Sequence, residues 1–182
     1  KASRAGCRMV FIGMESVNPR NIEAMGKNQN DPDEYRDMVA MWRDAGILVH
    51  VGYIVGMPYD TPEEVRADVA LLRDHIQVHE ASFFMLTPLP GSQDHADMVR
   101  NGVAIDPDPN LYDSAHETFA HPNMASGAWQ AAYDGAYGMM YSKQNIISIL
   151  LRTPRQWYWH MFWTCVWYRY SGVFAKTHPM AT

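Results

Sequence analysis

A carboxylate and a hydroxyl, Glu15 and Ser16, stand at the end of an apolar stretch that begins at residues 9–12. A carboxylate at the end of a buried strand can accept two hydrogen bonds from the hydroxyl groups of a sugar, and the serine hydroxyl can add a third contact. A structural explanation is equally open, in which Glu15 forms an ion pair at a helix end and Ser16 caps the turn. The pair is therefore a candidate sugar-binding site.

Two glycines, Gly52 and Gly56, lie on either side of Ile54 in the apolar stretch at residues 49–56. Glycine weakens the interior of a strand, and it often marks a place where another group approaches the backbone closely. A planar ligand lying against this strand would explain both glycines. A bulge or tight helix packing would explain them as well.

The third candidate segment is Leu86-Thr87-Pro88, at the end of the apolar run at residues 81–86. Pro88 and Pro90 remove two backbone donors, so the segment is stiff and leaves carbonyl oxygens exposed. We expect it to form a fixed wall beside a ligand, or else a rigid turn.

The three apolar runs are predicted strands, because each contains β-branched or aromatic residues, has strand length and ends at Gly or Pro. Helix signals separate them: Pro19 follows the cap residue Asn18, and cap-like starts recur at residues 31–34 and 61–64. Near-continuous apolarity and short connections predict βαβ units with parallel strands. Right-handed crossovers then bring the carboxyl ends of all three strands, with the candidate residues, to one edge of the sheet.

The chain after residue 92 loses this alternation. Residues 93–125 are rich in Asp, Asn, Pro and His and are predicted to form an irregular connecting segment at the surface or the ligand edge. Residues 126–182 are predicted to form a mainly helical extension that is most aromatic at residues 157–168. That stretch is too short and too interrupted to predict a transmembrane span, which needs roughly 20 apolar residues. The predicted division is therefore 1–92, 93–125 and 126–182.

Composition excludes several classes of protein. The 182 residues include 15 Lys and Arg against 20 Asp and Glu, a formal net charge of −5, which argues against a nucleic-acid partner. With 47% hydrophobic and 19% charged residues the chain can bury a core, so wholesale disorder is excluded. Cys7 and Cys165 form no disulfide framework and no pair at metal spacing, and a reducing, cytoplasmic setting is expected.

Taken together, the three segments resemble the fourth, fifth and sixth strands of a radical S-adenosylmethionine (radical SAM) barrel. The most similar subgroup carries an N-terminal cobalamin-binding domain. The resemblance implies that residues 1–92 form the C-terminal half of a partial β/α barrel of the TIM type, an α/β fold. It rests on residues 11–16, 52–58 and 84–91, together with Asn18-Pro19 and Met25-Gly26-Lys27.

The resemblance also implies SAM-binding residues on each strand. The polar pair contacts the ribose, the glycine-and-isoleucine motif supports the adenine, and the sixth-strand segment offers backbone groups to the adenine. The acidic residue that often closes the fifth-strand motif is replaced by Tyr59, with Asp60 next to it, so no role is carried over there. The implied residues are Glu15 and Ser16, then Gly52, Ile54 and Gly56, then Leu86, Thr87 and Pro88.

The resemblance implies two further cofactors whose ligands this chain lacks. Three thiolates of a CxxxCxxC loop hold a 4Fe–4S cluster, whereas Cys7 and Cys165 are far apart in the sequence. The cluster ligands, the missing N-terminal half of the barrel and a domain for cobalamin are expected outside this chain, as parts of a longer parent protein. No catalytic or metal-ligating residue is assigned within it.

The expected activity of the parent protein is reductive cleavage of SAM to a 5′-deoxyadenosyl radical, which abstracts hydrogen from a small-molecule substrate. Methyl transfer or ring chemistry follows where cobalamin takes part, and the protein supplies orientation and exclusion of water. Two alternatives remain open. One is a non-catalytic α/β module whose aromatic residues 157–175 dock on a membrane surface or a partner helix. The other is a β/α-barrel enzyme that needs no iron.

Overall fold

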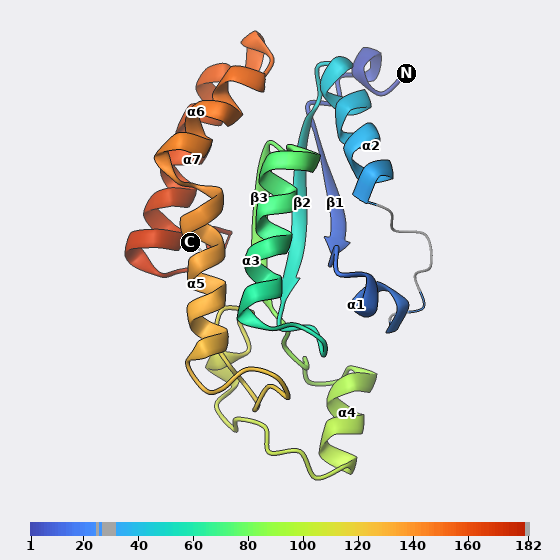
Figure 1. Cartoon of the computed structure of the whole chain (residues 1–182), viewed down its shortest axis with the longest axis vertical. Helices are drawn as coiled ribbons and strands as arrows, with labels where there is room; N and C mark the ends of the chain where they lie inside the picture. Colours follow the sequence, from blue (N-terminus) through green and yellow to red (C-terminus); the bar gives the residue numbers. More distant parts are fainter. Residues whose placement is uncertain (25, 27–31, 181–182) are drawn as a thin grey trace.

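The computed structural model describes residues 1–24, 26 and 32–180 (Figure 1). Met25, Lys27 and Asp31, which belong to two of the expected motifs, lie outside these residues.

In the described residues, three strands form an open parallel sheet in the order β1–β2–β3. They are β1 (Met9–Glu15), β2 (Leu48–Val55) and β3 (Glu80–Met85). Val10 of β1 lies opposite Val49, and Val51 of β2 lies opposite Ala81. The expected α/β class with parallel strands is confirmed. β2 is buried along almost its whole length, which explains its near-continuous apolar sequence.

Helices connect the strands, after a short 3₁₀ turn, η1 (Ser3–Ala5), at the start of the described chain. α1 (Pro19–Ala24) and α2 (Pro32–Asp44) lie between β1 and β2, and α3 (Pro62–Ala70) continues into a π-helical segment, η2 (Leu71–Ile76), before β3. α3 begins where the sequence predicts: Thr61 Oγ1 accepts a hydrogen bond from Glu64 N at 3.3 Å. Pro62 takes the first helical position, where no backbone donor is needed.

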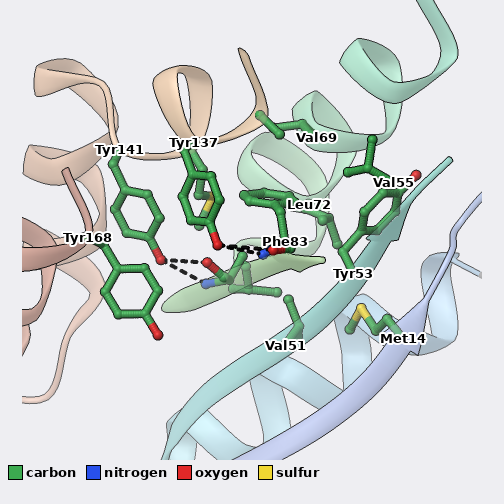
Figure 2. Packing of buried hydrophobic residues seen from close by; sticks show 14 of the residues in the cluster. Met14, Val51, Tyr53, Val55, Val69, Leu72, Phe83, Tyr137, Tyr141 and Tyr168 are labelled. Atoms are coloured by element: carbon green, nitrogen blue, oxygen red, sulfur yellow. Dashed lines mark hydrogen bonds between the residues drawn. The ribbon is translucent and has the colours of Figure 1, made fainter. Parts of the chain in front are cut away.

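The two faces of the sheet differ in what covers them. One face packs against α2, α3 and α5 and forms the hydrophobic core, in which Val51, Tyr53 and Phe83 are fully buried (Figure 2). The opposite face carries Phe11, whose side chain is 57% exposed, and the partly buried Ile54. Side chains alternate between faces along a strand, so the second face also receives the glycine Gly52.

The chain after β3 contains more helix than the sequence predicts. α4 (Gln93–Arg100) lies within the segment expected to be irregular, and a 3₁₀ turn, η3 (Pro109–Leu111), follows it. Ser92 caps α4 by accepting a hydrogen bond from His95 N at 3.2 Å. α4 has no buried residue. Its eight residues contain only three apolar side chains, those of Ala96, Met98 and Val99, which are too few to reveal a helical period in the sequence.

The C-terminal extension is helical, as expected. Its elements are α5 (Ala128–Met140), α6 (Lys143–Arg152), η4 (Arg155–Trp157), α7 (Tyr158–Arg169) and the π-helical η5 (Tyr170–Ala175). The extension is interrupted at Ser142, whose side chain caps α6 by accepting a hydrogen bond from Asn145 N at 3.3 Å.

Tyr137 of α5 and Tyr141, the residue directly after α5, cover the outer edge of β3 (Figure 2). The Tyr137 hydroxyl accepts a hydrogen bond from Phe83 N and donates one to Phe83 O, both at 3.1 Å. The Tyr141 hydroxyl does the same with Ala81, at 3.0 Å from N and 2.8 Å from O. These hydroxyls take the place of a neighbouring strand, so β3 ends the sheet.

The outer edge of β1 is different. Because Leu48 N donates to Arg8 O, only every second residue of β1 directs its backbone N–H and C=O groups toward β2. The backbone groups of Phe11 and Gly13 point away from β2, toward the outer edge. Within residues 1–24, 26 and 32–180, these outward groups have no hydrogen-bond partner. The sheet thus has one covered edge and one open edge.

Among the residues that the structure describes, no helix combines the length and the apolarity that crossing a membrane requires.

Candidate functional site

A cleft opens where the three strands end. It consists of two adjoining cavities of about 340 and 570 Å³, both within the range of roughly 300–1,000 Å³ that is usual for small-molecule sites. Both cavities are lined by Glu15, Ile54, Leu86 and Thr87. All but one of the residues predicted to bind a ligand border the cleft: Glu15, Gly52, Ile54, Gly56, Leu86, Thr87 and Pro88.

The segment after β3 closes the outer side of the larger cavity. Asp94 and Met98 of α4 line it, together with Phe119 and Pro122 of the following loop. In Figure 1, α4 lies beyond the carboxyl ends of the strands. The connecting segment therefore forms part of the cleft wall.

Glu15 occupies a strained turn at the end of β1. Its φ is +60°, which is uncommon for a residue with a side chain, and Ser16 N donates across it to Met14 O at 2.6 Å. The pairing register with β2 shifts between Gly13 and Glu15. Glu15 Oε1 lies 3.9 Å from the point where a Cβ on Gly13 would stand, so the carboxylate lies back over the strand beside the cleft. Strained residues of this kind gather at functional sites.

Ser16 lies beneath the turn rather than in the cleft. It is fully buried, and its Oγ accepts a hydrogen bond from Asn18 N at 3.1 Å. This is the structural alternative that the sequence left open, because the hydroxyl caps the turn before α1. Of the predicted polar pair, only Glu15 reaches the cleft.

Protein rings fill the space beside both glycines. A Cβ on Gly56 would lie 2.2 Å from the indole of Trp129, and the φ of Gly56 is +98°, so this position requires glycine on two grounds. A Cβ on Gly52 would lie 2.7 Å from the tip of the Phe11 ring. Because Phe11 is largely exposed, its ring can move away, and the constraint at Gly52 is weaker.

The third segment forms a wall with free acceptors. Leu86 N donates to Val55 O at 3.0 Å and ties the segment to β2, and Thr87 Oγ1 donates to Met85 O at 3.0 Å. The carbonyl oxygens of Leu86 and Thr87 accept no hydrogen bond from any described residue. They can accept hydrogen bonds from a ligand in the cleft.

Asp60 organises the loop between β2 and α3, a role that sequence analysis missed. Its Oδ2 accepts hydrogen bonds from Gly56 N and Met57 N, both at 2.9 Å, and its Oδ1 accepts one from Asn21 Nδ2 at 2.6 Å. Burial raises the pKa of Asp60, although these three donors oppose the shift. An Asp just before the helix cap Thr61 was the available signal, but its partners could not be read from the sequence.

His121 and Asn123 support the same loop from the far side. His121 Nε2 lies 3.1 Å from Met57 O, and His121 Nδ1 accepts a hydrogen bond from Asn123 N at 3.1 Å, so the proton is on Nε2. Asn123 Nδ2 donates to Pro58 O at 2.8 Å. The cleft wall at Met57 and Pro58 is thus held by side chains on both sides.

A buried pair lies under the Glu15 turn. The Tyr53 hydroxyl donates to Asp68 Oδ2 at 2.6 Å, and Asp68 also interacts with the backbone N–H of Val17. Burial raises the pKa of Asp68 to about 6, and Asp60 adds to the shift. The pair connects α3 to β2 and to the chain that follows Glu15.

We expect Asp68→Asn to stabilise the chain at neutral pH. With its pKa raised from 3.8 to about 6, Asp68 binds a proton more tightly in the folded chain than in the unfolded chain. Its contribution to stability is therefore present below the unfolded pKa and is lost as the pH rises from 3.8 to 6. At neutral pH the buried charge costs roughly 2–3 kcal/mol, which Asn avoids while still accepting the Tyr53 hydrogen bond.

Urea unfolding between pH 4 and pH 7.5 measures this effect. The free energy of unfolding of the unmutated chain should fall more steeply with rising pH than that of the Asp68→Asn variant. Asp37→Asn, at an exposed position, is the matched control and should keep the parent slope. Equal slopes for the parent chain and Asp68→Asn would contradict the assignment.

A second polar cluster lies on the opposite face of the sheet, the one that carries Phe11 and Ile54, nearer the amino ends of the strands. His50 Nε2 is 2.8 Å from Ser82 Oγ, His50 Nδ1 is 3.4 Å from Glu80 Oε1, and Ser82 Oγ is 3.0 Å from the Tyr168 hydroxyl. Burial, reinforced by His178, lowers the pKa of His50 to about 4, so its ring is neutral. Ser82 is fully buried, so the cluster joins α7 to the sheet and offers no accessible nucleophile.

The cysteines do not fit an iron–sulfur cluster. Cys7 is partly buried near the start of β1, and Cys165 is fully buried on α7, where burial raises the pKa of its thiol to about 12. Within the described ranges, no group of three His, Cys, Asp or Glu side chains could hold a metal ion.

Comparison with known proteins relates the chain to methyltransferases. No family model matches it. It is 33% identical over 88 residues to an uncharacterized methyltransferase of Pyrococcus horikoshii, which covers 48% of the chain and 19% of that protein. It is 24% identical over 153 residues to the bacteriochlorophyllide d C-8(2)-methyltransferase of Chlorobaculum tepidum, which covers 84% of the chain and 34% of that protein. The chain thus spans between a fifth and about a third of the length of these relatives.

A third relative and a solved structure extend the comparison. The bacteriochlorophyllide d C-12(1)-methyltransferase of Chlorobaculum tepidum is 24% identical over 161 residues, 87% of the chain and 34% of that protein. The structure of the radical SAM methyltransferase TsrM from Kitasatospora setae, with cobalamin and a [4Fe–4S] cluster bound, superposes with a TM-score of 0.49 at 21% identity. That match covers 72% of this chain and 25% of TsrM.

Proposed function

We propose that the cleft binds the adenosine part of SAM, and that the chain is the nucleoside-holding part of a methyltransferase of the radical SAM type. The observation that carries the proposal is that Glu15, Ile54 and the Leu86–Thr87 wall border the same cleft from three neighbouring strand ends. The methyltransferase relatives support the choice of SAM over other nucleosides.

Each part of the cleft has a task in this proposal. The Glu15 carboxylate accepts hydrogen bonds from the two ribose hydroxyls, and its strained turn holds it in place before the ligand arrives. Ile54 supplies an apolar surface for the adenine ring. The free carbonyl oxygens of Leu86 and Thr87 accept hydrogen bonds from the adenine amino group. Met98 and Phe119 exclude water from the opposite side.

Bound SAM supplies an activated methyl group and, in contact with a reduced iron–sulfur cluster, the 5′-deoxyadenosyl group. The cysteines of this chain do not fit such a cluster. The proposal therefore assigns the cluster, the radical step, cobalamin and the small-molecule substrate to a longer protein that includes these 182 residues.

The open edge of β1 supports a longer sheet. The backbone groups of Phe11 and Gly13 point toward that edge and form no hydrogen bond with any described residue. Tyr137 and Tyr141, in contrast, cover the edge of β3. A further parallel strand can therefore join beside β1 and not beside β3. A barrel built on this sheet grows from the β1 side.

We expect Glu15→Gln to weaken binding of SAM and of adenosine by roughly tenfold to a hundredfold. Gln keeps the shape of the side chain but replaces a charged acceptor, and hydrogen bonds to charged groups contribute about 1.5–3 kcal/mol. Isothermal titration calorimetry measures the affinity. The control is Glu63→Gln, an exposed residue of α3 that pairs with Arg66.

A second ligand separates the ribose contact from a general loss of structure. The parent chain should bind adenosine more tightly than 2′,3′-dideoxyadenosine, because only adenosine presents both hydroxyls to Glu15. Glu15→Gln should bind the two alike. A variant that keeps the preference would rule out the ribose role of Glu15, and a parent chain that binds neither SAM nor adenosine would rule out the site.

A further inference from the structure

The outward side of α7 and η5 is an aromatic surface. Trp159, Trp163 and Phe174 are each more than 60% exposed, which is unusual for such large apolar side chains. The buried side of α7 is narrow and consists of Met161, Cys165 and Tyr168. At 100° per residue, the exposed residues lie opposite that buried side. We call this surface the aromatic face: Trp159, Trp163, Val166, Trp167, Tyr170 and Phe174.

The charge of the chain is distributed unevenly around this face. Residues 143–182 contain five Lys and Arg residues and no Asp or Glu, whereas all 20 acidic residues of the chain come before residue 135. Arg155, the first residue of η4, is exposed, and Lys176 follows η5, where its side chain is 67% exposed and pairs with Asp134 Oδ2 at 2.8 Å. Arg169 lies over the ring of Phe174, 5.4 Å from its centre. A net basic, aromatic end is therefore attached to a net acidic body.

We propose that the aromatic face lies on the surface of a membrane that contains anionic lipids. Trp and Tyr side chains favour the boundary between lipid head groups and acyl chains, because one end of the ring system is polar and the rest is apolar. Arg155, before the amino end of the face, adds attraction to anionic head groups. α7 and η5, with 12 and 6 residues, together span at most about 27 Å, less than the roughly 30 Å of a bilayer core, and one side of α7 is buried against the chain, so the helix lies in the plane of the surface.

Part of the aromatic face also borders a cavity. Trp159, Trp163 and Trp167 line a cavity of about 630 Å³ together with Met9 and Glu80, between α7 and the sheet. Val166, Tyr170 and Phe174 do not line it. A protein segment filling that cavity would engage the tryptophans alone, whereas a membrane engages both groups of residues. This difference separates the two occupants in an experiment.

The test is flotation of the full chain with vesicles of phosphatidylcholine that contain phosphatidylglycerol, against vesicles of phosphatidylcholine alone. The chain should float with the anionic vesicles, and its tryptophan fluorescence should shift to shorter wavelength. Val166→Ser/Tyr170→Ser and Trp159→Ser/Trp163→Ser should each weaken partitioning by roughly tenfold, since apolar area leaves the interface. Arg155→Gln should weaken it by about fivefold at low salt.

The matched control is Met41→Ser/Val99→Ser, which removes exposed apolar side chains of α2 and α4 and should float like the parent chain. Circular dichroism of every variant confirms that the fold is kept. Failure to float with anionic vesicles would overturn the proposal. The proposal would also be overturned if Val166→Ser/Tyr170→Ser floated as well as the unmutated chain. A dimer in light scattering that the same double variant dissociates would overturn it as well. SAM binding is measured separately, so either proposal can fail alone.

Discussion

Gly56→Ala should destabilise the chain by roughly 3–5 kcal/mol or prevent folding. The left-handed φ of +98° costs a residue with a Cβ about 1–2 kcal/mol. The new methyl group would also stand 2.2 Å from the Trp129 indole, and overpacking of this kind costs about 1–3 kcal/mol. Moving the indole breaks the hydrogen bond from Trp129 Nε1 to Val55 O, which is 3.0 Å long. Urea unfolding measures the loss.

Two further variants test the explanation. Gly135→Ala changes a glycine in the middle of α5 where nothing but the helix's own neighbouring residues lies within 4 Å of the new methyl group, and it should stabilise the chain by about 0.5–1 kcal/mol. In a Trp129→Ala background the clash is gone, so Gly56→Ala should cost only the roughly 1–2 kcal/mol of backbone conformation. An equal cost in both backgrounds would show that Trp129 is not the obstacle.

The same substitution should also lower affinity for a ligand in the cleft. Trp129 packs edge-on against Phe119, with ring centres 5.2 Å apart, and lies the same distance from His121. Phe119 lines the larger cavity, and His121 supports the Met57 loop. A displaced indole would therefore disturb the cleft from behind.

Removing the two tyrosine hydroxyls over β3 should have the second-largest effect. Tyr137→Phe leaves the buried N–H and C=O of Phe83 without partners, and Tyr141→Phe does the same to Ala81. An unsatisfied buried backbone group costs about 1–3 kcal/mol, so each variant should lose roughly 2–3 kcal/mol of unfolding free energy. The double variant should also associate more readily, because an uncovered edge strand can pair with another chain.

Hydrogen exchange locates the change. The amide protons of Ala81 and Phe83 should exchange faster in the double variant, and those of β2 should be affected less. Tyr170→Phe removes an exposed hydroxyl and is the control, with an expected change within about 0.5 kcal/mol. If the Phe variants were as stable as the unmutated chain, the two hydroxyls would not be what stabilises the outer edge of β3.

The strands, their direction and the edge at which the candidate residues meet all follow from the order of amino acids along the chain. Continuous apolar runs such as residues 49–55 belong to strands buried on both sides, and the helix signals between them leave only parallel connections. Parallel strands place their carboxyl ends together. Glu15, Ile54 and Leu86 therefore reached one cleft as predicted.

Which of those residues face the cleft, and what surrounds them, depends on contacts between distant parts of the chain. Ser16 is buried under its turn, the ring of Trp129 packs against Gly56, and the Tyr137 hydroxyl hydrogen-bonds the outer edge of β3. Each of the last two contacts joins residues more than 50 positions apart in the sequence. Local pattern reports propensity and periodicity, which depend on neighbours along the chain. The position of α5 depends on how closely its side chains pack against the assembled sheet, and packing between residues far apart in the sequence leaves no local pattern.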